Sequence, residues 1–592
     1  MLTKALLGIF IAAVIKLTTR SWLQSGTVEV ASVLNSSYDF IVIGSGSAGS
    51  VIATRLAQNG DVTVLLLEAG GHFDEMEESH VPGLWYKMLK SDFDWEYYTE
   101  PQKSCGIGIN DRRIYWPRGR VLGGSSVINL MQYTRGNKYD YDEWERLGCK
   151  GWGYKDILTY FKRSENNVEP GLRATDYHGT DGPMGVSSGV VSPLADHYIQ
   201  AGKDMGYTIR DYNDGEQEGF SLYQIHIKDG VRSSTGKNYL SLVSGKKNIH
   251  VATNSFVTKI DIDNVDKSAK GVYFVRNNRK FYIKADKEVI LSAGAINSPQ
   301  LLMLSGIGPR DHLKKLGLPV KADLPVGENL QDHGRIQLFT HIDQPISVKS
   351  DTWSMYWNGI MYKLFGTGVL GKTLAEGTSF HYTDKSQRGK NYTNVQFNFF
   401  SSYQHANIES YNDTYFNELF SKTPKEYGFM TALIMNHLKS TGTITLKSSD
   451  PFDYPVIEPN YLSEKSDLDD VVKAIRIWER FIETPTMKSL GASVDQVRVT
   501  SCDNHIFRSD DYWKCYIRHF FITVYHPCCT CKMGAPNDKT TVLGPDLRVK
   551  GVKGLRVADA SSFPHETSGN INAPIIMLAE KAADLILDSW RK

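Results

Sequence analysis

The sequence lacks a hydrophobic run long enough to cross a membrane. Its first apolar stretch, Ala5–Ile15, lies between Lys4 and Lys16, whereas a membrane-spanning helix needs about 20 apolar residues. A basic residue followed by a short apolar segment is typical of a secretory signal peptide. We therefore predict a signal peptide at residues 1–22, secretion to the extracellular space, and no stable membrane insertion. An uncleaved anchor stays open, because no small-x-small cleavage site follows.

The sequence also lacks an excess of charge of either sign. Its 592 residues carry 67 Lys+Arg and 66 Asp+Glu, a formal net charge of +1, without a basic block that could form a nucleic-acid groove. We therefore expect no nucleic-acid partner. Three N-x-S/T sequons, at Asn35, Asn391 and Asn412, are compatible with a secreted glycoprotein.

Glycine, in contrast, is plentiful and clustered. The 51 glycines include the runs GSGSAG and LGGSS, and such clusters let backbone approach a ligand closely. The first run follows an apolar strand-like segment, Phe40–Ile43, and precedes helical apolar spacing over Ser50–Gln58. A second apolar segment, Val62–Leu67, ends at Glu68. This order predicts a strand–helix–strand unit of a dinucleotide-binding fold.

Each residue of this unit has a physical task. Gly44 permits the tight turn, Gly46 lets backbone N–H groups reach a pyrophosphate, and Gly49 lets the helix lie close to the strand. Glu68, about twenty residues on, can accept hydrogen bonds from a ribose 2′-OH and disfavours a 2′-phosphate. NAD and FAD both remain compatible with these residues.

Three later motifs narrow the choice. They are GRVLGGSSVIN at residues 119–129, GAINSPQLLMLSGIG at 294–308 and GENLQDH at 327–333. Together with the first glycine run they closely resemble the glucose–methanol–choline (GMC) family of FAD-dependent oxidoreductases, over nearly the whole chain from residue 38 onward. Within that family, the wording WPRGRVLGGSS and AEKAADLI is most similar to the secreted insect FAD glucose dehydrogenases.

The resemblance implies an α/β fold: a Rossmann-like FAD-binding domain, discontinuous in sequence, and an α+β substrate domain with a sheet over the flavin. It assigns residues 38–335 to the N-terminal FAD-binding region. Residues 336–438 would form part of the substrate domain, and residues 439–585 would form the C-terminal region. It also implies FAD contacts from Gly44, Gly46, Ser47, Ala48, Gly49, Glu68, Val121, Ser125, Asn129, Val257, Asp559 and Asn572. Some family members bind FAD covalently through a histidine. Ile128 corresponds to that position here, so we expect non-covalent FAD.

The stretch VYHPCCTCKMG at residues 524–534 resembles the segment that carries the family's catalytic histidine. His526 would be the base that removes the alcohol proton while hydride passes to flavin N5. Asn570 would hold the substrate oxygen as a neutral amide donor. Cys529 stands where the family usually has glycine, which can serve a positive φ or a close approach. His565 and His333 are expected to be loop residues.

The cysteines of this stretch permit other readings. A zinc site needs four ligands, usually two spaced pairs, and Cys502 and Cys515 are poorly spaced to complete Cys528 and Cys531. A thioredoxin-like pair needs a small βαβ setting, which this stretch does not have. We therefore predict no metal site and a local disulfide between Cys502 and Cys515.

The resemblance implies oxidation of a sugar or a small primary alcohol, with electrons passed to oxygen or a quinone. It leaves the substrate and the acceptor open. The departure at Cys529 keeps a second class open, an FAD-containing lyase or a non-redox binding protein of the same fold.

Overall fold

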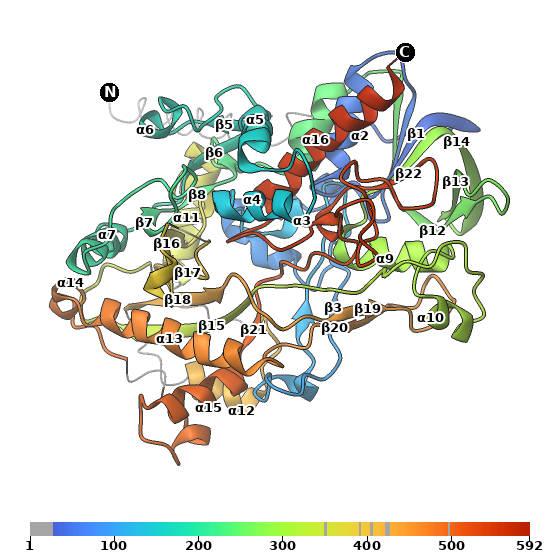
Figure 1. The fold of residues 1–592 in the computed structure, drawn as a ribbon. Helices are drawn as coiled ribbons and strands as arrows, with labels where there is room; N and C mark the ends of the chain where they lie inside the picture. The colour runs from blue at the N-terminus through green and yellow to red at the C-terminus, as the bar shows by residue number, and fades with distance from the viewer. Residues whose placement is uncertain are drawn as a thin grey trace, which may run out of the picture.

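The computed structural model describes residues 28–348, 352–389, 392–402, 407–420, 427–494 and 498–591. The predicted signal peptide and the sequon at Asn391 lie outside these residues. The described chain is an α/β protein built around a seven-stranded and a six-stranded sheet (Figure 1).

The seven-stranded sheet has the order β11-β2-β1-β14-β13-β12, with β22 paired to β14. Its strands are β1 (Ser37–Ile43), β2 (Val64–Leu67), β11 (Ile249–Ala252), β12 (Ser255–Ile262), β13 (Ala269–Arg276), β14 (Arg279–Leu291) and β22 (Leu555–Val557). β1 runs parallel to β2 and β14, and β22 runs parallel to β14. Parallel strands are covered on both faces, which explains the uninterrupted apolar run that ends β1.

The predicted strand–helix–strand unit is confirmed. β1 leads into α2 (Gly49–Gln58), and Phe40 of β1 pairs with Val64 of β2. β2 begins two residues later than expected. Just before it, the backbone N–H and the hydroxyl of Thr63 both donate to the Asp39 side chain, at Oδ2.

The C-terminal part of the chain returns to this sheet. α16 (Asn572–Trp590) packs against α2 and α5 (Tyr154–Ser164), and its red ribbon lies beside the blue α2 (Figure 1). Glu580, fully buried in α16, accepts from Arg55 at 2.7 Å and pairs with Arg163 at 2.6 Å. A buried carboxylate needs such partners, so α16 is fixed in place by both charge and packing.

The six-stranded sheet is antiparallel, in the order β21-β15-β18-β17-β16-β7. Its strands are β7 (Gly219–Leu222), β15 (Gly334–His341), β16 (Ala375–His381), β17 (Val395–Phe400), β18 (Gly428–Met435) and β21 (Ile522–Thr523). α13 (Lys465–Ile482) covers it with the buried stripe Val471, Ile475, Trp478 and Ile482, which has the spacing of one helical face. α7 (Leu194–Asp204) and α15 (Asp510–Phe520) pack on the same sheet.

Shorter elements connect these layers. The remaining α-helices are α3 (Ser125–Ile128), α4 (Lys138–Arg146), α6 (Pro170–Arg173), α8 (Thr235–Leu240), α9 (Gly294–Leu304), α10 (Arg310–Lys315), α11 (Thr352–Phe365), α12 (Asp413–Phe420) and α14 (Pro485–Ser489). The remaining strands are β3 (Tyr97–Tyr98), β4 (Tyr115–Trp116), β5 (Glu165–Asn167), β6 (Met184–Ser188), β8 (Gln224–Ile225), β9 (Ile227–Lys228), β10 (Val231–Arg232), β19 (Thr443–Thr445) and β20 (Val456–Glu458). Of the helices in the described ranges, none combines the length and apolar character needed to cross a bilayer.

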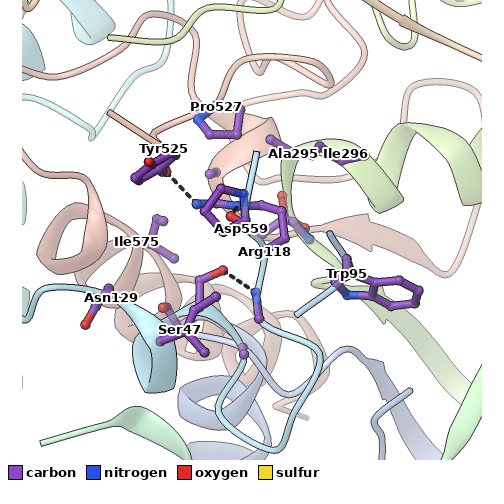
Figure 2. Close-up of a pocket in the computed structure, with 18 of the residues that line it drawn as sticks. Ser47, Trp95, Arg118, Asn129, Ala295, Ile296, Tyr525, Pro527, Asp559 and Ile575 are labelled. Atoms are coloured by element: carbon purple, nitrogen blue, oxygen red, sulfur yellow. Dashed lines mark hydrogen bonds between the residues drawn. The ribbon is translucent and has the colours of Figure 1, made fainter. Parts of the chain in front are cut away.

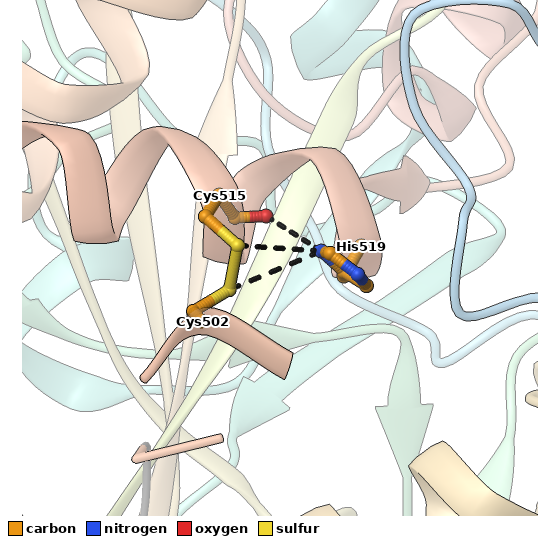
Figure 3. A group of neighbouring side chains, drawn as sticks. All are labelled: Cys502, Cys515 and His519. Carbon is orange, nitrogen blue, oxygen red and sulfur yellow. Dashed lines mark hydrogen bonds between the residues drawn. A yellow bond between two sulfur atoms is a disulfide. The ribbon is translucent and has the colours of Figure 1, made fainter. Parts of the chain in front are cut away.

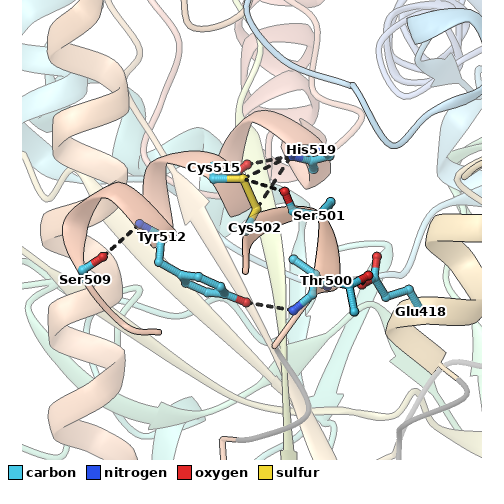
Figure 4. The surroundings of a disulfide bond; sticks show 9 residues. Glu418, Thr500, Ser501, Cys502, Ser509, Tyr512, Cys515 and His519 are labelled. Carbon is cyan, nitrogen blue, oxygen red and sulfur yellow. Dashed lines mark hydrogen bonds between the residues drawn. A yellow bond between two sulfur atoms is a disulfide. The ribbon is translucent and has the colours of Figure 1, made fainter. Parts of the chain in front are cut away.

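The disulfide expected between Cys502 and Cys515 is present (Figure 4). It ties the short turn Thr500–Cys502 to the middle of α15, thirteen residues further along the chain. The other five cysteines, Cys105, Cys149, Cys528, Cys529 and Cys531, are free and buried. The bridge therefore closes a small local loop at the edge of the second sheet.

Candidate active site

One pocket is lined by both sheets and by the segments that carry the predicted motifs (Figure 2). Twelve of the predicted site residues lie in its wall: Gly44, Gly46, Ser47, Ala48, Glu68, Ser125, Asn129, Val257, His526, Asp559, Asn570 and Asn572. In Figure 2, Tyr525 and Pro527 lie on one side of the pocket, and Ser47 and Asn129 lie on the other. The fold therefore brings residues from both ends of the chain to one cavity.

Two predicted residues, Gly49 and Val121, lie outside the pocket lining. A Cβ on Gly49 would lie 1.8 Å from the carbonyl oxygen of Gly44, so glycine there lets α2 start directly against the turn. Val121 is fully buried, and its carbonyl accepts from the Gly124 N–H at 2.6 Å. Both residues therefore lie outside the lining and support the turns that form it.

The two glycine turns meet at backbone distance. Gly44 has φ +89°, and a Cβ on it would lie 2.6 Å from the Ser292 carbonyl oxygen. Gly124 has φ +53°, and a Cβ on it would lie 2.6 Å from Gly46 Cα. A side chain at either position would fill the cradle or push the turns apart.

Two helices begin at this cradle. α2 follows Ala48, α16 follows Ile571, and neither helix has a side-chain cap. The Ser47 hydroxyl donates to Asn572 Oδ1 at 2.7 Å, and Asn572 Nδ2 is buried without a hydrogen-bond partner among the described residues. Uncapped N–H groups and the positive end of the helix dipole attract anions. The cradle is therefore suited to a pyrophosphate.

Glu68 ends β2 beside the first turn. Its carboxylate accepts from Ser45 N at 2.9 Å, Ser45 Oγ at 2.6 Å and Gly70 N at 2.9 Å. Burial raises the pKa of Glu68, although these donors oppose the shift. A carboxylate has about four acceptor sites, so three bonds within the protein leave room for a further donor from the pocket.

Asp559 ties the C-terminal segment to the start of α9. One carboxylate oxygen accepts from Gly294 N at 2.8 Å and Ser298 Oγ at 2.6 Å, and the other accepts from Ser561 N at 2.8 Å. On the opposite wall, Asn129 Oδ1 accepts from Met131 N at 3.0 Å and from Arg232 Nη1 at 2.9 Å. Both residues are held in fixed orientations.

His526 is held by three neighbours. Its backbone N–H donates to Asp332 Oδ1 at 2.7 Å, its Nδ1 lies 2.9 Å from His333 Nδ1, and its Nε2 lies 3.3 Å from Asn570 Nδ2. Burial, with the nearby His333, Arg118 and Arg335, holds the pKa of His526 well below its usual range. The imidazole is therefore neutral at physiological pH.

The Asn570 amide has its orientation set by its surroundings. Its Oδ1 accepts from Tyr223 OH at 2.8 Å and from Thr134 Oγ1 at 3.3 Å. Its Nδ2 donates to Gln132 Oε1 at 2.9 Å and faces His526 Nε2. Two hydroxyl donors on the oxygen turn the NH₂ group towards the pocket. Asn570 thus presents a neutral hydrogen-bond donor beside the imidazole.

Cys529, which stands where the family usually has glycine, lies in the loop that carries His526. Cys529 has φ +72°, in the left-handed region, and its N–H donates to the Ala560 carbonyl at 3.0 Å. Its Sγ lies 2.9 Å from Cys528 Sγ, and both side chains are fully buried. The position therefore has the backbone conformation that favours glycine, and the cysteine tolerates it.

Several pocket residues were not singled out by the sequence reasoning. Arg118 follows Pro117 within the quoted WPRGRVLGGSS run, and Arg335 comes two residues after the quoted GENLQDH run; both line the pocket near His526. His333, expected to be a loop residue, contacts His526 directly. His565 lies outside the lining and stacks near His437. For Arg118 and His333, the signal available in the sequence was their position inside a quoted motif.

Within the described ranges, one cluster has the composition of a metal site. It consists of Cys502, Cys515 and His519 (Figure 3). The two sulfurs are bonded to each other, and zinc takes cysteine as thiolate. The His519 Nδ1 lies 2.9 Å from the Cys515 carbonyl oxygen. The cluster is therefore a disulfide next to a histidine whose ring contacts the backbone of its own helix, α15.

Comparison with known proteins settles the family. The GMC oxidoreductase profile matches residues 38–335 with its N-terminal part and residues 439–579 with its C-terminal part. The chain belongs to the GMC oxidoreductase family. This GMC oxidoreductase is an FAD-dependent enzyme that acts on CH–OH donors of small-molecule alcohols or sugars.

Relatives and solved structures cover nearly the whole chain. The glucose dehydrogenase [FAD, quinone] of Drosophila pseudoobscura pseudoobscura is 38% identical over 561 residues, 93% of this chain and 87% of that protein. The mitochondrial choline dehydrogenase of Homo sapiens is 38% identical over 565 residues, 93% and 89% of the two chains. A variant of the formate oxidase of Aspergillus oryzae RIB40 has a TM-score of 0.83 at 26% identity, over 94% and 99%.

The residues of this GMC oxidoreductase fit FAD. The glycine cradle leaves no space for a Cβ, the two uncapped helix starts face it, and the buried Asn572 Nδ2 is unsatisfied without a ligand. All three features are explained by an anionic group held by backbone.

Proposed function

We propose that this enzyme oxidises a sugar or a small primary alcohol, with His526 as the general base and Asn570 as the donor to the substrate oxygen. The observation that carries the proposal is the 3.3 Å approach of His526 Nε2 and Asn570 Nδ2 in the wall that also contains the nucleotide cradle. FAD, when bound, supplies the hydride acceptor. The protein then has to orient the alcohol and take its proton.

The proposed base is kept in the required tautomer by its neighbours. Nε2 can accept a proton only if the ring proton of neutral His526 sits on Nδ1. Nδ1 then donates to His333 Nδ1, at 2.9 Å. The other ring nitrogen of His333 lies 3.5 Å from the Glu566 carboxylate. The contact of His333 with Nδ1 and of the Asn570 amide with Nε2 both favour the tautomer that has its lone pair on Nε2.

The charges around His526 support the same assignment. Arg118 and Arg335 lower the pKa of His526 because they disfavour a second positive charge. The same guanidinium groups stabilise negative charge that develops on a substrate oxygen. Together with the Asn570 amide they lower the cost of removing the alcohol proton.

We further propose that FAD is held without a covalent bond. Ile128 lines the pocket and offers no nucleophile. Glu68 would bind the adenosine ribose, Val257 the adenine, and Asn129 the isoalloxazine side. Precipitation of the protein with acid should release all flavin into the supernatant, whereas flavin retained on the precipitated chain would contradict non-covalent binding.

The proposed setting is extracellular, with oxygen or a quinone as the electron acceptor. The disulfide is typical of oxidising compartments, and the sequons at Asn35 and Asn412 are exposed. The similarity to an insect glucose dehydrogenase [FAD, quinone] supports a quinone-type acceptor. In domain terms, residues 38–335 and 439–585 would hold FAD and the catalytic pair, and residues 336–438 would contribute to the substrate side.

Anaerobic addition of alcohols and sugars to the purified holoenzyme tests the proposal. Loss of the oxidised flavin absorbance indicates oxidation. His526→Ala should retain bound FAD and lose about 10²–10⁴-fold of the reduction rate. His565→Ala, outside the pocket lining, is the matched control and should keep the rate. Unchanged flavin absorbance across the whole panel would instead favour a lyase or a non-redox binding protein.

A further inference from the structure

The substrate side of the pocket contains an arginine from the second sheet. Arg335 on β15 pairs with Ile434 on β18, and Asn398 on β17 pairs with Ala432 on β18. All four line the pocket, so they share one face of the sheet. Arg335 is 6% exposed, and its Nε is buried without a hydrogen-bond partner among the described residues. The protein therefore leaves one donor of this guanidinium group unsatisfied.

A second guanidinium group reinforces the first. Arg118 also lines the pocket and donates through Nη2 to the Tyr525 carbonyl (Figure 2). Both arginines lie close enough to His526 to lower its pKa. A positive charge on a substrate bound at His526 would meet the same repulsion.

Carboxylates at the pocket do not reverse this charge. The two acidic residues in the described lining are Glu68 and Asp559, and each already accepts from several donors on the nucleotide side. Glu409, outside the lining, pairs with Arg335 at 3.0 Å and also accepts from Gln337 at 3.2 Å. Burial lowers the pKa of Arg118, and the nearby carboxylates of Asp332 and Asp94 oppose that shift. Glu409, Asp94 and Asp332 lie outside the lining and offset part of the positive charge of the two arginines. The arginines themselves line the cavity.

Two of the five aromatic residues in the described lining, which are Trp85, Trp95, Phe256, Phe400 and Tyr525, already have a cation on one face. Quaternary ammonium groups are commonly bound on the faces of aromatic rings. The Tyr525 ring has the Arg335 guanidinium group 5.5 Å from its centroid, and the Trp95 ring has that of Arg120 at 4.9 Å. Both rings line the pocket, and each already has a cation on its face.

We infer that Arg335 is a specificity-determining residue that makes this pocket reject alcohols with a positive charge and accept neutral or anionic ones. The inference rests on the proposed oxidation at His526 and narrows its substrate class. Like charges placed together in a poorly solvated site are strongly unfavourable, and specificity often comes from such a repulsive element. The pocket would therefore discriminate against choline and favour neutral sugars, neutral alcohols or hydroxy acids.

Two alcohols of the same shape test this inference. Choline carries a quaternary ammonium group, and 3,3-dimethylbutan-1-ol carries the uncharged carbon analogue. The measurement is the ratio of kcat/KM for the neutral alcohol to that for choline, from anaerobic flavin reduction by the holoenzyme. We expect this ratio to fall about 10- to 100-fold in Arg335→Gln. Glu409→Gln is the paired variant, and it should raise the ratio because it leaves Arg335 uncompensated. An equal ratio in wild type and both variants, or a preference for choline in wild type, would overturn the inference.

Binding measurements keep the inference separate from catalysis. Pivalate and tetramethylammonium are similar in size and opposite in charge, and each can be titrated against the oxidised holoenzyme by flavin absorbance. Wild type should bind pivalate at least about tenfold more tightly, and Arg335→Gln should lose this preference. Equal affinities in wild type would refute the charge selection even if alcohols reduce the flavin. If no alcohol reduces the flavin while the anion preference holds, the proposed oxidation fails and the charge selection stands.

Discussion

His333 is the residue whose contact most directly affects the proposed base. Its Nδ1 lies 2.9 Å from His526 Nδ1, and its own pKa is lowered to about 3 by burial. It is therefore neutral, and in the proposed tautomer it accepts from His526 Nδ1 without touching the substrate.

We predict that His333→Asn lowers the flavin reduction rate by about 10- to 100-fold, the usual effect of removing a group that orients a reacting side chain. Because His526 has a lowered pKa, its base form is present above that pKa and is lost only as pH falls through it. The wild-type rate should thus stay level down to below pH ~6.5, the ordinary histidine value. Burial, Arg118 and Arg335 still lower this pKa in the variant, so its remaining rate should also stay level across that range. His505→Asn, outside the pocket lining, is the control. A rate equal to that of wild type would show that His333 does not orient His526.

Cys529 offers a test of backbone strain. In an ordinary position alanine is preferred to glycine by about 0.5–1 kcal/mol. At φ +72° a side chain costs about 1–2 kcal/mol, so the order should reverse. We predict that Cys529→Gly has a higher free energy of unfolding than Cys529→Ala by about 1 kcal/mol, measured by denaturation of the two holoenzymes. Both variants should keep flavin reduction. Greater stability of the alanine variant would show that the loop relaxes around φ.

The residues of the site could be predicted where a motif determines both their chemical role and their position. Gly44, Gly46, His526 and Asn570 were predicted from local motifs, and the structure brings them to one pocket. Arg335 was not predictable, because its direction depends on the register of β15 against β18. The His333–His526 contact joins residues 193 positions apart, and no local pattern reports such a distance.

Among the elements, α15 depends most clearly on a single covalent bond. The Cys502–Cys515 bridge joins its middle to the preceding turn, and Tyr516 of α15 donates to the Gln337 carbonyl of β15 at 2.8 Å. The bridge restricts the unfolded chain by closing a short loop.

We predict that Cys502→Ser combined with Cys515→Ser lowers the free energy of unfolding by about 2–4 kcal/mol. Alkylation of the unfolded, unreduced wild type should label five cysteines, and labelling after reduction should reach seven. Cys105→Ser, which removes a free thiol, is the control for the labelling count. Labelling of seven cysteines without reductant would contradict the bridge.

A helix or strand could be predicted from the sequence where the residues that determine it are close together in the chain. β1, α2 and β2 follow each other directly, so apolar spacing and the glycine turn predicted them with errors of three residues or fewer. The strands of the second sheet come from residues 219–523, and their pairing is set by contacts across the molecule. The resemblance implied that sheet, and no local pattern in the sequence predicted its pairing.

On the scale of the whole molecule, the two sheets share one cavity. Gly44 and Glu68 come from the seven-stranded sheet, whereas Arg335 and Ala432 come from the six-stranded sheet, and all line the same pocket. A ligand in this pocket should therefore couple the stability of both halves.

We predict that removing FAD lowers the melting temperature and that adding FAD restores it in a single cooperative transition. FAD at about 100 times its dissociation constant adds about 2.7 kcal/mol to the free energy of unfolding. Calorimetric scans of the apoprotein and holoenzyme measure the effect. Two transitions, of which only one moves with FAD, would show that the halves unfold independently.

The return of β22 and α16 to the first sheet also has a consequence for how the protein is made. Ribosomes release the N-terminal segment first, yet the Ser47 hydroxyl bonds to Asn572, 525 positions later. Domains usually complete their folding as they emerge, but this one must wait, with the surface of α2 that contacts α16 uncovered, until residues 555–590 are synthesised. A nascent chain therefore depends on protection from aggregation for most of its translation, and cofactor loading becomes a post-translational event.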